Sequence, residues 1–350
     1  MNNDDYFNNA VELYDNKDYI KALSIFTSLY FNHTNIQGFL TDYISKSYYQ
    51  LYKENFEKGN YYSSYELLCR ANEYNNNKNE YEDELKKVES LKNYREGQNL
   101  LYVEKNFKEA LSKLKTSYQL YEYINEDINK EREFDIRYAI YEYCNLFYND
   151  LNDENLLSML KKEKYINDLL NEGINNCNDE LLLSKLKKIK SKISSKFNLY
   201  HCFELESSNE LDKAIEICKK SLSDCDEELK KKFKTRLSEL YQLKGEKLYD
   251  ICTSYDDINL LSEILEYYKK ALNLIDYKND NYDKLKLSIS TIEITLLLIN
   301  ANNFKEQKKY NEAYENYIKA NNINKKYNER LYNPKELEDR IKEIEEIIKI

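Results

Sequence analysis

Few residues of this sequence could carry acid–base or nucleophilic chemistry. Catalysis by Ser, Cys or His needs a base within reach of the nucleophile, and the chain offers two histidines, His33 and His201. His201 precedes Cys202, but neighbours on a helix point about 100° apart and do not form a working pair. No two His or Cys residues stand four apart to hold a metal, and no glycine-rich phosphate loop is present. Because carboxylates are too numerous for a catalytic pair to be recognised by pattern, an enzyme stays the least favoured alternative, and we expect no catalytic, cofactor-binding or metal residues.

The cysteines do not suggest a cross-linked or zinc-bound framework. They number seven, are scattered, and never occur as C-x-x-C, which argues against a set of disulfides or a zinc site. We expect reduced thiols that fill small sites in the core: Cys69, Cys144, Cys177, Cys202, Cys218, Cys225 and Cys252.

Net charge and hydropathy limit the partners and the compartment. The net charge of −10 disfavours general binding to nucleic acid or an anionic membrane, since phosphate contacts need a cationic face. No apolar run approaches the roughly 18 residues that span a bilayer, and the first residues, MNNDDYFNNA, lack the cationic and apolar regions of a signal peptide. We expect a soluble, cytoplasmic protein.

The elements that must position any functional side chain come from one repeated figure. From Phe107, an aromatic residue is followed at +3 by Ala110, at +7 by Leu114 and at +10 by Ser117, so bulky and small residues alternate along one helical face. The figure starts again at Tyr19, Tyr61, Leu211, Leu261 and Tyr310. One Pro and five Gly in 350 residues leave little material for β-turns. The pattern predicts an all-α protein.

The spacing of the figure indicates copies of one unit. Its first small position falls at residues 22, 64, 110, 214, 264 and 313, and the long gap implies a hidden copy near Leu156 to Leu170. Each copy has a first helix, a short polar break and a second helix that carries the figure. We expect a single array over residues 1–350, with units at about 4–34, 37–77, 79–125, 127–176, 179–225, 226–278 and 281–329.

The end of the chain predicts one more helix. After Pro334, the segment KELEDRIKEIEEIIKI places Leu337, Ile341, Ile344 and Ile348 on one stripe. We expect residues 334–350 to cap the open end of the array, as solenoids require. The alternative is a dimer seam, with self-association through this helix.

The figure resembles that of tetratricopeptide repeats. The small residues Ala22, Ala110, Ala214 and Ala313 and the aromatic or aliphatic residue four later match that family's packing signature. The resemblance implies a right-handed α-solenoid of about seven antiparallel helix hairpins that serves as a protein–protein interaction scaffold. The units are longer than the family's usual length of about 34 residues, and its usual Pro after the second helix is absent.

In repeats of this type the first helices line a concave groove that receives a peptide. Positions fifteen and eleven before Ser64 are Tyr49 and Lys53, and the same offsets from Ala110 give Arg95 and Asn99. Flanking positions complete the expected partner groove with Lys46, Lys92 and Tyr102. Cations and tyrosines together suit an acidic peptide or a C-terminal carboxylate.

A second candidate surface is the basic stretch Leu181 to Phe197. Its apolar residues Leu182, Leu186, Ile189 and Ile193 form one face, and Lys185, Lys188, Lys192 and Lys196 form another. We expect it to be a first helix of the array with solvated lysines; the alternative is an adaptor that this helix recruits to anionic lipid or nucleic acid. A further alternative is an accessory or regulatory subunit that works through its ends and convex face. The favoured hypothesis is a non-enzymatic scaffold that holds a partner segment in the groove.

Overall fold

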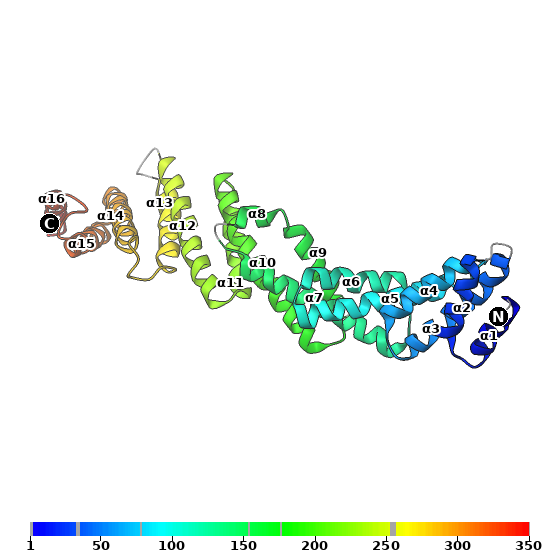
Figure 1. Cartoon of the computed structure of the whole chain (residues 1–350). Helices are drawn as coiled ribbons and strands as arrows, with labels where there is room; N and C mark the ends of the chain where they lie inside the picture. Colours follow the sequence, from blue (N-terminus) through cyan, green and yellow to red (C-terminus); the bar gives the residue numbers. More distant parts are fainter. Residues whose placement is uncertain are drawn as a thin grey trace. The chain divides into compact units, whose positions relative to one another are not determined.

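The computed structural model describes residues 3–32, 36–77, 79–152, 155–175, 177–252 and 257–349. Within these ranges every regular element is a helix, which confirms the predicted all-α class. The chain divides into two compact units, Met1–Ile189 and Lys190–Ile350, and the division lies inside α10 (Glu180–Ser207). Within each unit the helices pack mainly against their neighbours in sequence (Figure 1). No helix of the described ranges is long and apolar enough to cross a bilayer.

The first unit contains α1 (Asn3–Asp15), α2 (Tyr19–Asn32), α3 (Gln37–Glu57), α4 (Tyr61–Tyr74), α5 (Glu82–Asn99), the π-helical turn η2 (Leu100–Glu104), α6 (Phe107–Leu120), α7 (Glu126–Asp150), α8 (Leu156–Leu160), α9 (Glu163–Ile174) and the start of α10. The second unit continues with the rest of α10, α11 (Leu211–Asp224), α12 (Glu227–Asp250), α13 (Ile258–Leu272), α14 (Tyr282–Glu306), α15 (Tyr310–Lys326) and α16 (Pro334–Ile348). The hidden copy that we expected near Leu156 to Leu170 falls on α8 and α9.

The small residues of the repeated figure are fully buried, because paired helices approach closely at these points. Solvent reaches none of Ala22, Ser64, Ala110, Ala214 and Ala313. The pair α5–α6 illustrates the contact: Ser90 reaches Ser117 and Gly97 faces Leu114, so the two helices run in opposite directions. A Cβ atom on Gly97 would lie 2.7 Å from Leu114 Cγ, too close for any real side chain.

The breaks between paired helices are tight turns with one left-handed residue. Lys17, Gly59, Lys105, Asn209 and Lys308 have φ between 56° and 75°. Gly, Asn and Asp adopt this conformation most readily, but three of the five residues are lysines. The helix pairing imposes the turn, and a lysine can adopt it at a cost of about 1 kcal/mol. The sequence also predicts a polar break at Ser254 to Asn259, of which residues 254–256 lie outside the described residues.

The π-helical turn adds one residue to the pair α5–α6. In the turn after α3, the amide of Asn60 donates to the carbonyl of Asn55 at 3.0 Å, five residues back. After η2, the amide of Asn106 donates to the carbonyl of Leu100 at 2.9 Å, six residues back. A π-helix holds one more residue per hydrogen bond than an α-helix, so it accommodates the insertion without interrupting the helix.

The last helix covers the end of the second unit. Asn333 caps α16, since its side chain accepts from the amide of Lys335 at 3.1 Å, and Pro334 takes the first helical position. Leu337 and Ile344 are fully buried in a cluster with residues of α14 and α15, while Ile348 is 41% exposed. The apolar stripe is thus largely used within the chain.

Candidate partner-binding site

The structure separates the groups that could have made a nucleophilic pair. His201 Nδ1 lies 3.0 Å from Glu204 Oε2 on an exposed part of α10, whereas Cys202 is fully buried. His33 lies outside the described residues. Within the described part of the chain, no cluster of three or more His, Cys, Asp or Glu side chains could hold a metal ion.

Two of the predicted groove residues, Tyr49 and Lys53, lie together on α3. The ammonium of Lys53 sits 4.4 Å above the centre of the Tyr49 ring, a cation–π contact, and Lys53 is exposed. The Tyr49 hydroxyl donates to Glu84 Oε1 on α5 at 2.9 Å, and its ring stacks on Tyr81 at 4.8 Å. Burial and the Glu84 carboxylate raise the pKa of Tyr49, so the hydroxyl stays protonated and keeps donating. Tyr49 is thereby fixed as a platform for Lys53.

An aromatic row continues from Tyr49 toward Arg95. We define the row as Tyr49, Tyr52, Phe56 and Tyr61, whose ring centres follow one another at 5.5, 5.7 and 5.6 Å. The Arg95 guanidinium lies 5.9 Å from the Tyr61 ring at its far end. The row therefore joins the predicted residues of α3 to Arg95 on α5.

A third cation, missed by the sequence analysis, lies over the middle of the aromatic row. Lys87 of α5 places its ammonium 5.9 Å from the centre of the Phe56 ring. Within the described ranges, Lys53, Lys87 and Arg95 form no ion pair with a carboxylate; Arg95 donates to the neutral Gln98 at 2.8 Å. Lys87 escaped notice because it faces Phe56 only once α3 and α5 are packed. These cations keep hydrogen-bond donors for a further anionic group.

Lys46 and Lys92 lie apart from the aromatic row. Lys46 forms an exposed ion pair with Asp42 at 2.8 Å, one turn earlier on α3. Lys92 turns toward α4, where its ammonium lies 4.6 Å from the Tyr65 ring and 5.6 Å from the Tyr62 ring. Both remain predicted groove residues, but their charges are directed to other contacts.

Asn99 and Tyr102 have local and long-range partners respectively. Asn99 donates to Glu104 at 2.6 Å within the same helical end. The Tyr102 hydroxyl donates to the buried carboxylate of Asp135 on α7, and its ring stacks on Tyr138 at 6.0 Å. Burial and the Asp135 charge raise the pKa of Tyr102. Tyr102 therefore belongs to a polar cluster between α5 and α7 and not to the aromatic row.

The centre of that cluster is Asp135, which is 3% exposed. It accepts from Tyr94 at 3.1 Å, from Gln98 at 2.9 Å and from Tyr102. A buried carboxylate held by three donors stabilises the packing of the helices around it. Without those hydrogen bonds, burying the charge would cost a large desolvation free energy. Tyr94 thus makes the same kind of contact to α7 that Tyr49 makes to α5.

The contacts identify Tyr94 and Gln98 as the structural counterparts of Tyr49 and Lys53. Counting back from Ala110 at fixed offsets selects Arg95 and Asn99, one residue further on, because the π-helical turn inserts a residue between the two helices. Arg95 nevertheless reaches the aromatic row through Tyr61. The counting therefore missed the buried Asp135 cluster and still selected a residue at the end of the row.

The first unit also has an open cavity of about 450 Å³ among α6, α7 and α9. Lys115 and Glu172 form a 2.6 Å ion pair at its edge, and Ile136 and Ile140 supply apolar lining. No sequence pattern predicts this cavity, because its lining residues come from three separate helices. Its charged residues are paired, Lys115 with Glu172 and Arg137 with Glu133, so it offers fewer donors to a ligand than the aromatic row does.

We call the basic stretch Leu181 to Phe197, which lies in α10, the lysine helix; its apolar side is buried in the core. Leu182, Leu186, Ile189 and Ile193 are each at most 3% exposed, as expected for a helix of the array. Lys185 and Lys188 are exposed, and Lys185 also lies 5.7 Å from the Tyr141 ring. Comparison of the whole chain with family models and with curated proteins finds no match.

Proposed function

We propose that this chain is a non-enzymatic, TPR-like scaffold that binds an acidic segment of a partner protein along the aromatic row. In this proposal the chain is a right-handed solenoid of about seven hairpins with α16 as its cap. The fully buried small residues and the recurring left-handed turns support the repeated design.

The observation that carries the proposal is the alignment of three cations with four rings. Lys53, Lys87 and Arg95 lie over Tyr49, Phe56 and Tyr61 respectively. Aromatic rings hold the cations in place without neutralising them, so each can still pair with a carboxylate. The partly exposed rings of Tyr49, Phe56 and Tyr61 provide apolar contact area between the charges. An extended peptide with carboxylates separated by apolar or aromatic residues matches this order.

The recruitment alternative has weaker support. A basic amphipathic helix binds a bilayer by placing its apolar face among the acyl chains. The apolar face of the lysine helix is already buried, and its exposed lysines are Lys185, Lys187 and Lys188 on the first turns. Three exposed lysines can attract anions, but they cannot insert.

A selection with a displayed random-peptide library on the full chain tests the proposal. We expect acidic peptides with interspersed apolar residues to be enriched. The affinity of one selected peptide is then measured by fluorescence anisotropy, and Lys53→Ala/Arg95→Ala should weaken it by roughly tenfold or more, since charge-assisted hydrogen bonds contribute about 1.5–3 kcal/mol each.

The matched control is Lys187→Ala/Lys188→Ala on the lysine helix, which should leave the affinity unchanged. Circular dichroism of each variant verifies that the fold is kept. Equal affinity of the wild type and Lys53→Ala/Arg95→Ala, or loss with the control pair alone, would reject the aromatic row as the site.

A further inference from the structure

Cys202 and Cys218 occupy a point of closest approach between paired helices. Gly97 faces Leu114 in the pair α5–α6, and Gly245 faces Tyr268 in the pair α12–α13. A Cβ atom on Gly245 would lie only 2.5 Å from the tyrosine ring. Ser195 is buried seven residues before Cys202, as Ser90 and Ser238 are buried seven residues before Gly97 and Gly245. The pair α10–α11 therefore has two cysteines where these two pairs have a glycine opposite a large side chain.

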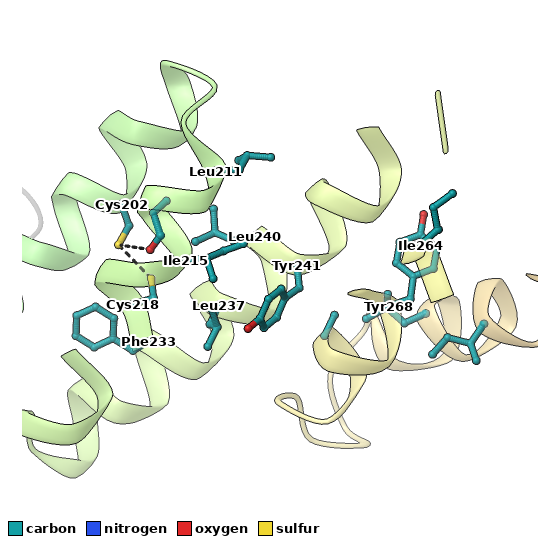
Figure 2. Packing of buried hydrophobic residues seen from close by; sticks show 14 of the residues in the cluster. Cys202, Leu211, Ile215, Cys218, Phe233, Leu237, Leu240, Tyr241, Ile264 and Tyr268 are labelled. Atoms are coloured by element: carbon teal, nitrogen blue, oxygen red, sulfur yellow. Dashed lines mark hydrogen bonds between the residues drawn. The ribbon is translucent and has the colours of Figure 1, made fainter. Parts of the chain in front are cut away.

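The two sulfurs point at one another across this crossing (Figure 2). Their Sγ atoms are 3.1 Å apart, closer than the roughly 3.5–4.0 Å of ordinary packing contacts. Cys202 Sγ also lies 3.5 Å from the carbonyl oxygen of Ala214. Both side chains are fully buried, and Phe233 packs within the same cluster. Covalent bonding at about 2.05 Å requires the sulfurs to approach by only about 1 Å.

The surroundings distinguish the two thiols. Hydrogen bonding with Cys218, and then the positive charge of Arg236, lower the pKa of Cys202. The same shared hydrogen bond, together with burial, raises the pKa of Cys218. Cys202 is thus the thiol that ionises first, and Cys218 keeps its proton.

We propose that Cys202 and Cys218 are a modification site at which a hydroperoxide forms a reversible disulfide between α10 and α11. The Cys202 thiolate attacks the O–O bond of the hydroperoxide; an S–O bond forms, the O–O bond breaks, and the leaving oxygen takes up a proton. The Cys218 sulfur then attacks the Cys202 sulfenic acid. The S–S bond forms, the S–O bond breaks, and the hydroxide leaves as water with the Cys218 proton.

The electrons and atoms of this reaction balance. Two thiols supply two electrons, and the hydroperoxide is reduced to an alcohol, or to water when the reagent is hydrogen peroxide, with one further water formed. A small-molecule dithiol reverses it by two thiol–disulfide exchanges. Both sulfurs are buried, so the hydroperoxide reaches them only when α10 and α11 separate locally near the turn at Asn209. The oxidation rate therefore depends on the rate of that local opening.

Peptide mapping of the full chain tests the proposal directly. The protein is treated with hydrogen peroxide, remaining thiols are alkylated, and trypsin is added without reductant. Cleavage after Lys196, Lys213 and Lys219 places the two cysteines on separate peptides, 197–213 and 214–219. We expect a linked pair whose mass is two hydrogens below the sum, and its disappearance after dithiothreitol. Absence of this pair while other cysteines are oxidised would overturn the proposal.

Thermal unfolding supplies a second readout. The cross-link closes a short loop in the unfolded chain, so the oxidised wild type should melt several degrees higher and return to its original Tm on reduction. Cys218→Ser should lose both the linked peptide and the Tm shift, whereas Cys225→Ser, a buried cysteine of the same cluster, should retain both. A Tm shift that survives in Cys218→Ser would assign it to another cysteine. The wild-type map decides the outcome even where a variant fails to fold.

Discussion

Ser90 Oγ donates a 2.7 Å hydrogen bond to the carbonyl oxygen of Ser117, linking the middle of α5 to the last turns of α6. The same bond recurs from Ser45 to the carbonyl of Ala71 at 2.8 Å and from Ser238 to that of Ala271 at 2.9 Å. Each of these serines is buried. The repeated bond fixes how far one helix can slide along its partner.

Ser90→Ala should destabilise the protein by about 1 kcal/mol, the usual contribution of a buried hydrogen bond. We expect a lower urea midpoint with an unchanged slope. Ser112→Ala is the matched control, because Ser112 is exposed on the partner helix α6, and it should stay within about 0.5 kcal/mol of wild type. Equal midpoints for Ser90→Ala and wild type would mean that the bond does not hold the pair.

Glycines at crowded and open helical positions should respond oppositely to alanine. In Gly97→Ala the new methyl group meets Leu114 Cγ at 2.7 Å, so overpacking should cost about 1–3 kcal/mol despite the better helix propensity of Ala. At Gly38, on the first turn of α3, nothing lies within 4 Å of such a group. Gly38→Ala should be neutral or stabilise by up to about 1 kcal/mol. The urea midpoints of the two variants are measured in parallel. A decrease in both midpoints, or an increase in both, would contradict this packing.

Ala110→Glu should be severely destabilising. Ala110 is fully buried where α6 packs against α5, and a glutamate there overfills the site and buries a charge. We expect a loss of about 3 kcal/mol or more, seen as a lower and broader thermal transition. Lys108→Glu places the same charge on an exposed position of the first turn of α6 and should leave the Tm nearly unchanged. A wild-type Tm for Ala110→Glu would refute the predicted helix face.

Tyr268 should make stability fall at high pH. Burial, followed by the charges of Glu246, Tyr249 and Asp250, raises the pKa of Tyr268 to about 12, above the ordinary value of about 10. The folded state holds this proton more tightly, so the contribution is complete below pH 10 and is lost as pH rises from 10 to 12. Its size is roughly 2–3 kcal/mol. The urea midpoint of wild type should therefore fall more steeply over this range than that of Tyr268→Phe, and parallel curves would contradict the assignment.

The sequence was most informative where one residue type is needed locally. The buried small positions such as Ala110 and Ala313 were predicted because the spacing of bulky and small residues follows the helical period of 3.6 residues. The cap of α16 by Asn333 and Pro334 follows from the same local chemistry. The helical class and the element positions could therefore be predicted closely.

Local sequence patterns could not predict the contacts between separate helices. Asp135 accepts hydrogen bonds from Tyr94 and Tyr102, which lie more than thirty residues away in the chain. Lys87 of α5 contacts Phe56 of α3, and α4 lies between them in the sequence. Nothing near Asp135 in the sequence marks it as buried, since an aspartate on a helix is ordinarily solvated. The one-residue insertion at η2 was invisible for a related reason: an extra residue shifts the count but leaves each local pattern intact.

The π-helical turn has a consequence for how chains of this kind can change over time. A residue inserted at Leu100–Glu104 is absorbed there, so Ser90 still meets Ser117 and Gly97 still faces Leu114. Length can thus drift inside a helix while the contacts on both sides stay the same. Two such chains could share every packing contact and still fail to align by spacing, which makes contacts a better measure of their kinship than distance along the sequence.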